Sequence, residues 1–94
     1  MSSTPIKGGL YAERKEDGSG YMITKVLRVD FAVHIQIYKE DFKELPKEIH
    51  SSQLTIALGH APMSAEGWGK THILVGQEPV TEDELFGYHV YMGG

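Results

Sequence analysis

The sequence predicts an α+β fold in which a small antiparallel sheet is closed by a C-terminal helix. Three observations support this prediction. Apolar residues alternate with polar ones along successive runs in the first half of the chain, a hairpin signal joins the first two runs, and a helix-start signal lies near the C-terminus. A small half-open β-barrel is the alternative arrangement of the same strands.

Chain length and composition indicate one domain. Ninety-four residues provide for a single hydrophobic core. The hydrophobic content of 40% and the charged content of 23% are ordinary for a globular domain. We expect residues 1–5, which are small and polar, to form a disordered tail and residues 6–94 to form one globular unit.

The first three strands are predicted with short links, as an antiparallel meander. Residues 6–13 form the first strand, and the polar stretch 15–20, which contains Asp-Gly, forms a hairpin turn. Residues 21–29 form the second strand, in which Lys25 interrupts an apolar face. Residues 33–38 give the clearest strand signal, with one buried face and one wetter face. The wetter face carries His34, Gln36 and Tyr38.

The second half of the chain contains shorter signals. Residues 39–52 include Pro46 and are predicted to hold one turn of helix at most. Short apolar runs predict strands at 54–58 and 72–75, separated by a Gly-His-Ala-Pro turn at 59–62. Ser64 can cap a short helical turn between these strands.

The C-terminal segment combines two conflicting patterns. Thr81 and Glu84 have the spacing of a capping box, and Val80 and Leu85 have that of a hydrophobic staple. The run from Phe86 to Met92 also alternates like a strand. Because caps specify where a helix begins, we predict a helix from Glu82 to about Met92 that buries most of its apolar groups against the sheet.

Two stretches also resemble a known group of proteins. Residues 59–64 (GHAPMS) and 78–94 (EPVTEDELFGYHVYMGG) resemble the ending of a group of small uncharacterised bacterial proteins, and residues 9–38 resemble their first half. The resemblance supports the C-terminal helix and implies no activity or site residue, because that group has no established function. The chain departs from the group's pattern in its short segment between Tyr38 and Gly59, and in Gly67 and Gly69.

Composition excludes several classes of function. The net charge is −4, with nine basic and thirteen acidic residues, so we expect no binding to nucleic acid phosphates. No apolar run approaches the length of a membrane span, and we expect no membrane association. The absence of cysteine excludes disulfides and thiolate chemistry and favours a cytoplasmic location.

Catalytic and metal signatures are incomplete. Residues 67–71 (GWGKT) resemble the end of a phosphate-binding loop, but Ser64 occupies the position of the required first glycine and a strand-like run follows. Residues 18–20 (GSG) form a hairpin tip rather than a nucleophile elbow. The five histidines form no local metal motif. We therefore predict a protein that is not an enzyme and has no catalytic residue, metal or cofactor.

The candidate binding residues are polar and aromatic. We expect the wetter sheet face to present a surface to a partner, joined by a histidine in the predicted turn and a tryptophan in the glycine loop. This candidate set is Tyr11, His34, Gln36, Tyr38, His60 and Trp68.

Two functions remain open at this point. The first is a non-enzymatic protein-binding module, in a specific form an inhibitor or immunity-type protein for a basic partner, which acts through that surface or the acidic residues 78–84. A homodimer is a further form of protein contact. The alternative is a small-ligand or metal-binding protein in which His34 and His60 converge.

Overall fold

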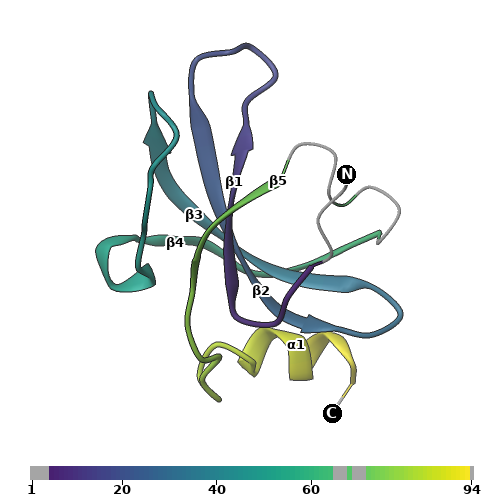
Figure 1. The fold of residues 1–94 in the computed structure, drawn as a ribbon. Coiled ribbons are helices and arrows are strands. Elements are labelled where there is room, and N and C mark those ends of the chain that lie inside the picture. Colours follow the sequence, from purple (N-terminus) through teal and green to yellow (C-terminus); the bar gives the residue numbers. More distant parts are fainter. Residues whose placement is uncertain (1–4, 65–67, 69–71, 94) are drawn as a thin grey trace.

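A five-stranded antiparallel sheet and one short C-terminal helix make up the computed structural model, which describes residues 5–64, 68 and 72–93 (Figure 1). The order of strands in the sheet is β4-β3-β2-β1-β5. The sheet is open, with β4 and β5 as the edges among the described strands. The α+β prediction is confirmed at this level. The elements are β1 Gly9–Arg14, β2 Tyr21–Val29, β3 Val33–Phe42, the 3₁₀ helix η1 Ser51–Gln53, β4 Ile56–Met63, β5 His72–Gln77 and α1 Phe86–Tyr91.

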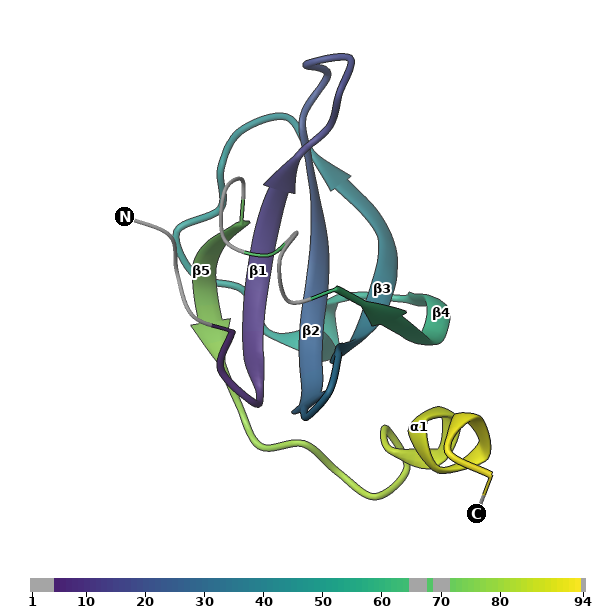
Figure 2. The same ribbon diagram turned by 90° about the vertical axis from the view of Figure 1, so that its right-hand side faces the viewer.

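The β1–β2 hairpin forms where Asp-Gly predicted it. The Lys15 N–H donates to Gly20 O at 2.8 Å, and the Asp17 carboxylate accepts from the Ser19 N–H at 2.9 Å. Gly18 has a φ of 74°, which glycine adopts without a Cβ clash. The hairpin tip and α1 lie at opposite ends of the molecule in both views (Figures 1 and 2).

Both faces of the sheet are covered. Tyr11 lies opposite Thr24, and Val26 lies opposite Ile35, so these side chains share one face. That face holds the cluster formed by Tyr11, Val26, Val33, Ile35 and Trp68.

The other face was predicted to be wetter, and this is wrong. His34, Gln36 and Tyr38 are all buried. Tyr38 packs in a cluster with Ile49, and Lys25 on the same face bonds to the segment after β5. Alternation identified the polar face correctly, but distant segments of the chain cover it.

β4 differs from its predicted extent. The strand continues through residues 59–62, where a turn was expected. Pro62 is tolerated because β4 is an edge strand, in which one side of the backbone needs no hydrogen-bonded neighbour. β3 likewise extends to Phe42, beyond its predicted end at Tyr38. Three predictions fall wholly or mainly outside the described residues. They are the tail at residues 1–5, of which only Pro5 is described, the helical turn after Ser64, and the GWGKT loop, of which only Trp68 is described.

The predicted capping box forms, but in the turns that precede the C-terminal helix; α1 itself begins at Phe86, with Leu85 as its N-cap. The Thr81 N–H donates to Glu84 Oε1 at 2.9 Å, and the Glu84 N–H donates to Thr81 Oγ1 at 3.2 Å. Val80 packs on the cluster of Leu27, Leu85 and Tyr88, as a hydrophobic staple requires. Residues 82–85 form turns, so the regular helix is shorter than predicted.

The predicted burial of the helix is wrong for most of its apolar groups. Leu85 and Tyr88 are buried, whereas the side chains of Phe86, Val90, Tyr91 and Met92 are exposed. The short helix meets only the end of the sheet, beside β4 (Figure 2), so one narrow stripe is covered. Within the described part of the chain, no helix has the length and apolar character needed to cross a membrane.

Candidate functional site

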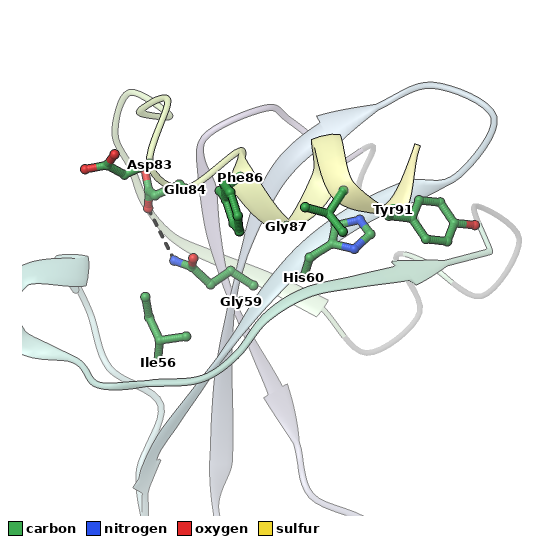
Figure 3. Close-up of a pocket in the computed structure, with 10 residues that line it drawn as sticks. Ile56, Gly59, His60, Asp83, Glu84, Phe86, Gly87 and Tyr91 are labelled. Carbon is green, nitrogen blue, oxygen red and sulfur yellow. Dashed lines mark hydrogen bonds between the residues drawn. The ribbon is translucent and has the colours of Figure 1, made fainter. Parts of the chain in front are cut away.

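A pocket of about 470 Å³ opens between α1 and β4 (Figure 3). Its volume falls in the range of ligand-binding clefts. We call it the α1–β4 pocket. Its lining residues are Gln36, Ile56, Gly59, His60, Asp83, Glu84, Phe86, Gly87, Val90 and Tyr91.

Glycine at position 87 permits the close approach of helix and strand that shapes this pocket. A Cβ atom added to Gly87 would lie 2.7 Å from the Cβ of His60. It would also lie 3.7 Å from the backbone of Gly59. The helix therefore sits directly on the strand at this point, and the pocket opens beside the contact.

The pocket walls are apolar and aromatic. Ile56 of β4 and Val90 of α1 supply aliphatic surface, and Phe86 and Tyr91 supply rings. Phe86 is 71% exposed, which is unusual for a phenylalanine in a small domain that has a sheet to pack on. Exposed apolar side chains around a hollow are typical of a surface that another molecule covers.

A chain of hydrogen bonds joins Tyr88 and Asp30 to His60 through the buried His34. The Tyr88 hydroxyl donates to Asp30 Oδ2 at 3.0 Å, and Asp30 Oδ1 lies 2.8 Å from His34 Nε2. His34 Nδ1 in turn lies 2.8 Å from His60 Nε2. We call Asp30, His34 and His60 the histidine chain. His34 is fully buried, whereas His60 lines the pocket.

The protonation of the histidine chain depends first on Asp30, its carboxylic acid. Burial raises the pKa of Asp30, but hydrogen bonds from the Ala32 N–H, His34 and Tyr88 lower it on balance, so this group is a carboxylate. A carboxylate only accepts, so His34 Nε2 carries a proton. Burial, and then the neighbouring His34, lower the pKa of His60, which keeps that ring neutral at pH 7.

What His60 presents to the pocket depends on where the protons of the two rings lie. When both rings are neutral, His60 Nε2–H donates to His34 Nδ1, and His60 Nδ1 holds a lone pair. No hydrogen bond to this Nδ1 comes from the described residues. In this state the histidine chain holds a neutral acceptor in place on the β4 side of the pocket.

The other end of the pocket is acidic. Asp83 is exposed at the start of the helical segment, and Glu84 lies beside it, hydrogen-bonded to Gln36 (Figure 3). Glu84 also binds Lys25, which is 1% exposed. Lys25 Nζ contacts Glu84 Oε1 and Oε2 at 2.9 Å each, Glu78 Oε1 at 3.0 Å and Pro79 O at 2.9 Å. We call Lys25, Glu78 and Glu84 the lysine cluster.

The lysine cluster carries a net negative charge. Burial lowers the pKa of Lys25, but its bonds to Glu84 and Glu78 raise it on balance. Burial likewise opposes ionisation of the two glutamates, yet hydrogen bonds lower the pKa of both, from Ser51 and Lys25 to Glu78 and from Thr81 and Lys25 to Glu84. One cation between two carboxylates leaves a charge of −1, and Asp83 adds another beside the pocket.

The six candidate binding residues separate into two groups. His34 and His60 converge in the histidine chain, and Gln36 lines the same pocket. Tyr38 lies behind them, and its hydroxyl accepts from Gln36 Nε2 at 2.9 Å. Tyr11 and Trp68 lie on the opposite face of the sheet and pack edge to face, with ring centroids 4.9 Å apart.

Several residues of this site were not among the six predicted binding residues. The sequence offered signals for two of them: Lys25 in an otherwise apolar strand face, and Asp30 four residues before His34. The acidic segment 78–84 was considered as a partner surface, but Glu78 and Glu84 turn inward to Lys25. The helix was expected to bury most of its apolar groups against the sheet, whereas Phe86 and Tyr91 border the pocket.

The polar and apolar groups of the pocket are suited to recognition of a guest molecule. Among the described residues, no group of three or more histidine, aspartate or glutamate side chains is placed to hold a metal ion. The polar groups of the pocket are mainly acceptors, and its walls are apolar. Such a pocket suits a guest that has an apolar body and a positively charged or hydrogen-bond-donating end.

Fold and site together define a small α+β domain with a pocket of about 470 Å³ at one end of its sheet. No protein-family model, curated protein or solved structure matches the chain.

Proposed function

We propose that the protein is a non-enzymatic protein-binding module that takes an arginine or lysine side chain of a basic partner into the α1–β4 pocket. The observation that supports the proposal is the pairing of apolar and aromatic walls with acidic groups in one pocket. An arginine or lysine side chain has a matching form, with an aliphatic stem and a cationic head.

The electrostatics favour a cation over an anion. Asp83 and the net negative lysine cluster lie at one end of the pocket, and neutral His60 presents an acceptor at another. Phe86 and Tyr91 offer ring faces, which attract guanidinium and ammonium groups. The net charge of −4 on the whole chain would speed the encounter with a basic partner.

The test uses defined probes and needs no knowledge of the partner. Nα-acetyl-arginine amide is titrated into ¹⁵N-labelled protein, with the neutral isostere Nα-acetyl-citrulline amide as the matched ligand. We expect saturable shifts of the Gly59, Gly87 and Val90 amides with the arginine probe, at millimolar affinity. The citrulline probe should bind at least several-fold more weakly, because it lacks the charge.

Two variants test whether the Asp83 carboxylate contributes to binding of the arginine probe. Asp83→Asn should weaken the arginine probe several-fold, whereas Glu16→Gln, which removes an exposed carboxylate at the distant hairpin, should not. An arginine probe that causes no saturable shift at the pocket contradicts the proposal. So does an affinity that Asp83→Asn leaves unchanged.

A second candidate is a small neutral ligand that donates a hydrogen bond to His60. The observation that favours it is the fixed acceptor that the histidine chain creates. Equal binding of the citrulline and arginine probes, lost in His60→Ala, would favour this second function over the first.

A further inference from the structure

The edge strand β4 lacks the charged residues that usually protect such strands. From Ile49 to Ala65 the sequence has no Asp, Glu, Lys or Arg, although 23% of the chain is charged. All of β4 lies in this neutral stretch. Edge strands present unpaired backbone groups, and proteins commonly guard them with charges, bulges or a covering segment.

The first half of β4 is exposed and apolar. Ile56 is 50% exposed and Leu58 is 49% exposed, and Ala57 and Gly59 between and beside them are exposed as well. Among the described strands, β4 pairs with β3 alone. Pro62, which has no backbone N–H to donate, lies in the second half of the strand.

The opposite edge of the sheet is covered in part. At β5, the Ile49 N–H donates to Val75 O at 3.1 Å, so the segment before η1 lies along that strand. The backbone hydrogen bonds of the described residues include no such cover for residues 56–63 of β4. The two edges therefore differ in this cover. The register of β4 on β3 shifts between Ile35 and Ile37 and again between Ile37 and Tyr38, so β4 is an irregular edge, but no backbone of the described residues pairs along its outer side.

Charge indicates which strand can pair with it. Each copy of the chain carries −4, so two copies repel wherever acidic surfaces meet. The residues of β4 add no charge of their own to this repulsion, although Asp83 and Glu84 line the pocket beside Ile56. The strand also offers no attraction for a basic partner, which distinguishes it from the α1–β4 pocket. An antiparallel pair of identical strands is related by a two-fold axis and is self-complementary.

We propose that β4 pairs antiparallel with β4 of a second copy, so that two sheets join into one across a two-fold axis. Because this axis runs normal to the sheet, both α1–β4 pockets open on the same side of the dimer. The proposal is independent of what the pocket binds. If the pocket binds basic side chains, the dimer would present two such sites to one partner.

Sedimentation velocity over about 1–500 µM protein tests the proposal through the mass action of association. We expect a reversible monomer–dimer equilibrium. Leu58→Lys should weaken association at least tenfold, because it places like charges across the interface, and its aliphatic stem can replace the leucine packing in the folded monomer. Ala57→Lys, at an exposed neighbour, provides a second variant if Leu58→Lys fails to fold.

Two matched controls add the same charge elsewhere. Phe31→Lys changes an exposed apolar residue between β2 and β3, and Ile73→Lys changes an exposed residue of the other edge strand. Both should dimerise like the parent chain. Hydrogen exchange at residues 56–61 should slow as the protein concentration rises.

Three outcomes overturn the proposal. They are a monomer at every concentration, open-ended aggregation in place of a closed dimer, and a dimer that Ile73→Lys disrupts but the β4 variants do not.

Discussion

Two polar clusters lie on the same face of the sheet and differ in how completely the protein satisfies them. In the lysine cluster, the three donors of Lys25 meet the two glutamates and a backbone carbonyl. In the histidine chain, buried His34 is bonded to Asp30 at the surface, and the other end reaches the α1–β4 pocket at His60.

The difference gives the lysine cluster mainly a folding role, although its Glu84 also lines the pocket, and gives the histidine chain a role in the pocket. The lysine cluster connects β2 to residues 78–84 and so holds the segment that leads into α1. Its hydrogen-bonding capacity is used within the chain. The histidine chain fixes the orientation of one ring and leaves that ring an acceptor beside the pocket. Buried polar groups thus serve the same fold in two ways.

Removal of Lys25 should have the largest effect on stability. Lys25→Met leaves Glu78 and Glu84 close together without a cation, and breaking a buried ion pair in this way costs about 3–5 kcal/mol. We expect a loss near the lower figure, about 3 kcal/mol, because both glutamates retain some contact with water. Chemical denaturation measures the change in the free energy of unfolding.

Lys15→Met is the matched control for that prediction. Lys15 and Asp41 form an exposed ion pair at 2.7 Å, and such pairs contribute little to stability because water screens them. Equal destabilisation by the two substitutions would show that the buried lysine cluster stabilises the fold no more than an exposed ion pair does. That result would contradict the folding role assigned to the lysine cluster.

A substitution at Gly87 should have an intermediate effect. Alanine normally favours a helix over glycine by about 1 kcal/mol. Here its Cβ would lie 2.7 Å from the His60 Cβ, so the helix or the strand must move. We expect Gly87→Ala to destabilise the protein by about 1–3 kcal/mol, in the range of overpacked sites.

Gly59→Ala tests the cause of that effect. A Cβ at Gly59 meets no atom within 4 Å, although the residue lies beside the same contact. This variant should be neutral or slightly stabilising in thermal denaturation. A Gly87→Ala protein that is as stable as the parent chain would contradict the tight packing of α1 on β4.

The parts of the fold that the sequence predicted depend on local signals. The Asp-Gly hairpin and the Thr81–Glu84 capping box each lie within a few residues, so their hydrogen bonds follow from spacing alone. The alternation in β3 likewise separated its two faces correctly. The sequence could not predict which segment would cover the polar face.

The pocket depends on contacts between residues far apart in the chain. Lys25 bonds to a residue 59 positions later, and His34 bonds to one 26 positions later. The histidines were recognised as candidates because of their residue type, but their meeting depends on the path of β4 through residues 59–62. Phe86 and Tyr91 stay exposed because α1 is short, and no apolar pattern in the sequence encodes that length.

Acidification should have the smallest of these effects on stability, and it should act on the two clusters at different pH values. The pKa of His60 is lowered in the folded protein, by burial and then by His34, so the unfolded chain takes up a proton first. Stability contributed by neutral His60 is present above the ordinary histidine pKa of about 6.5 and is lost as the pH falls below it. The pKa values of Glu78 and Glu84 are also lowered, so their contribution persists until the pH falls below about 4.3.

Melting temperatures measured from pH 8 to pH 3 should therefore fall in two steps. His60→Gln, which can still donate to His34, should flatten the upper step and leave the lower one in place. His72, whose pKa burial also lowers, is present in both proteins, so the difference between the two curves reports on position 60. Identical curves above pH 5 would mean that His60 is not held neutral by the fold, and the acceptor assigned to the pocket would lose its physical basis.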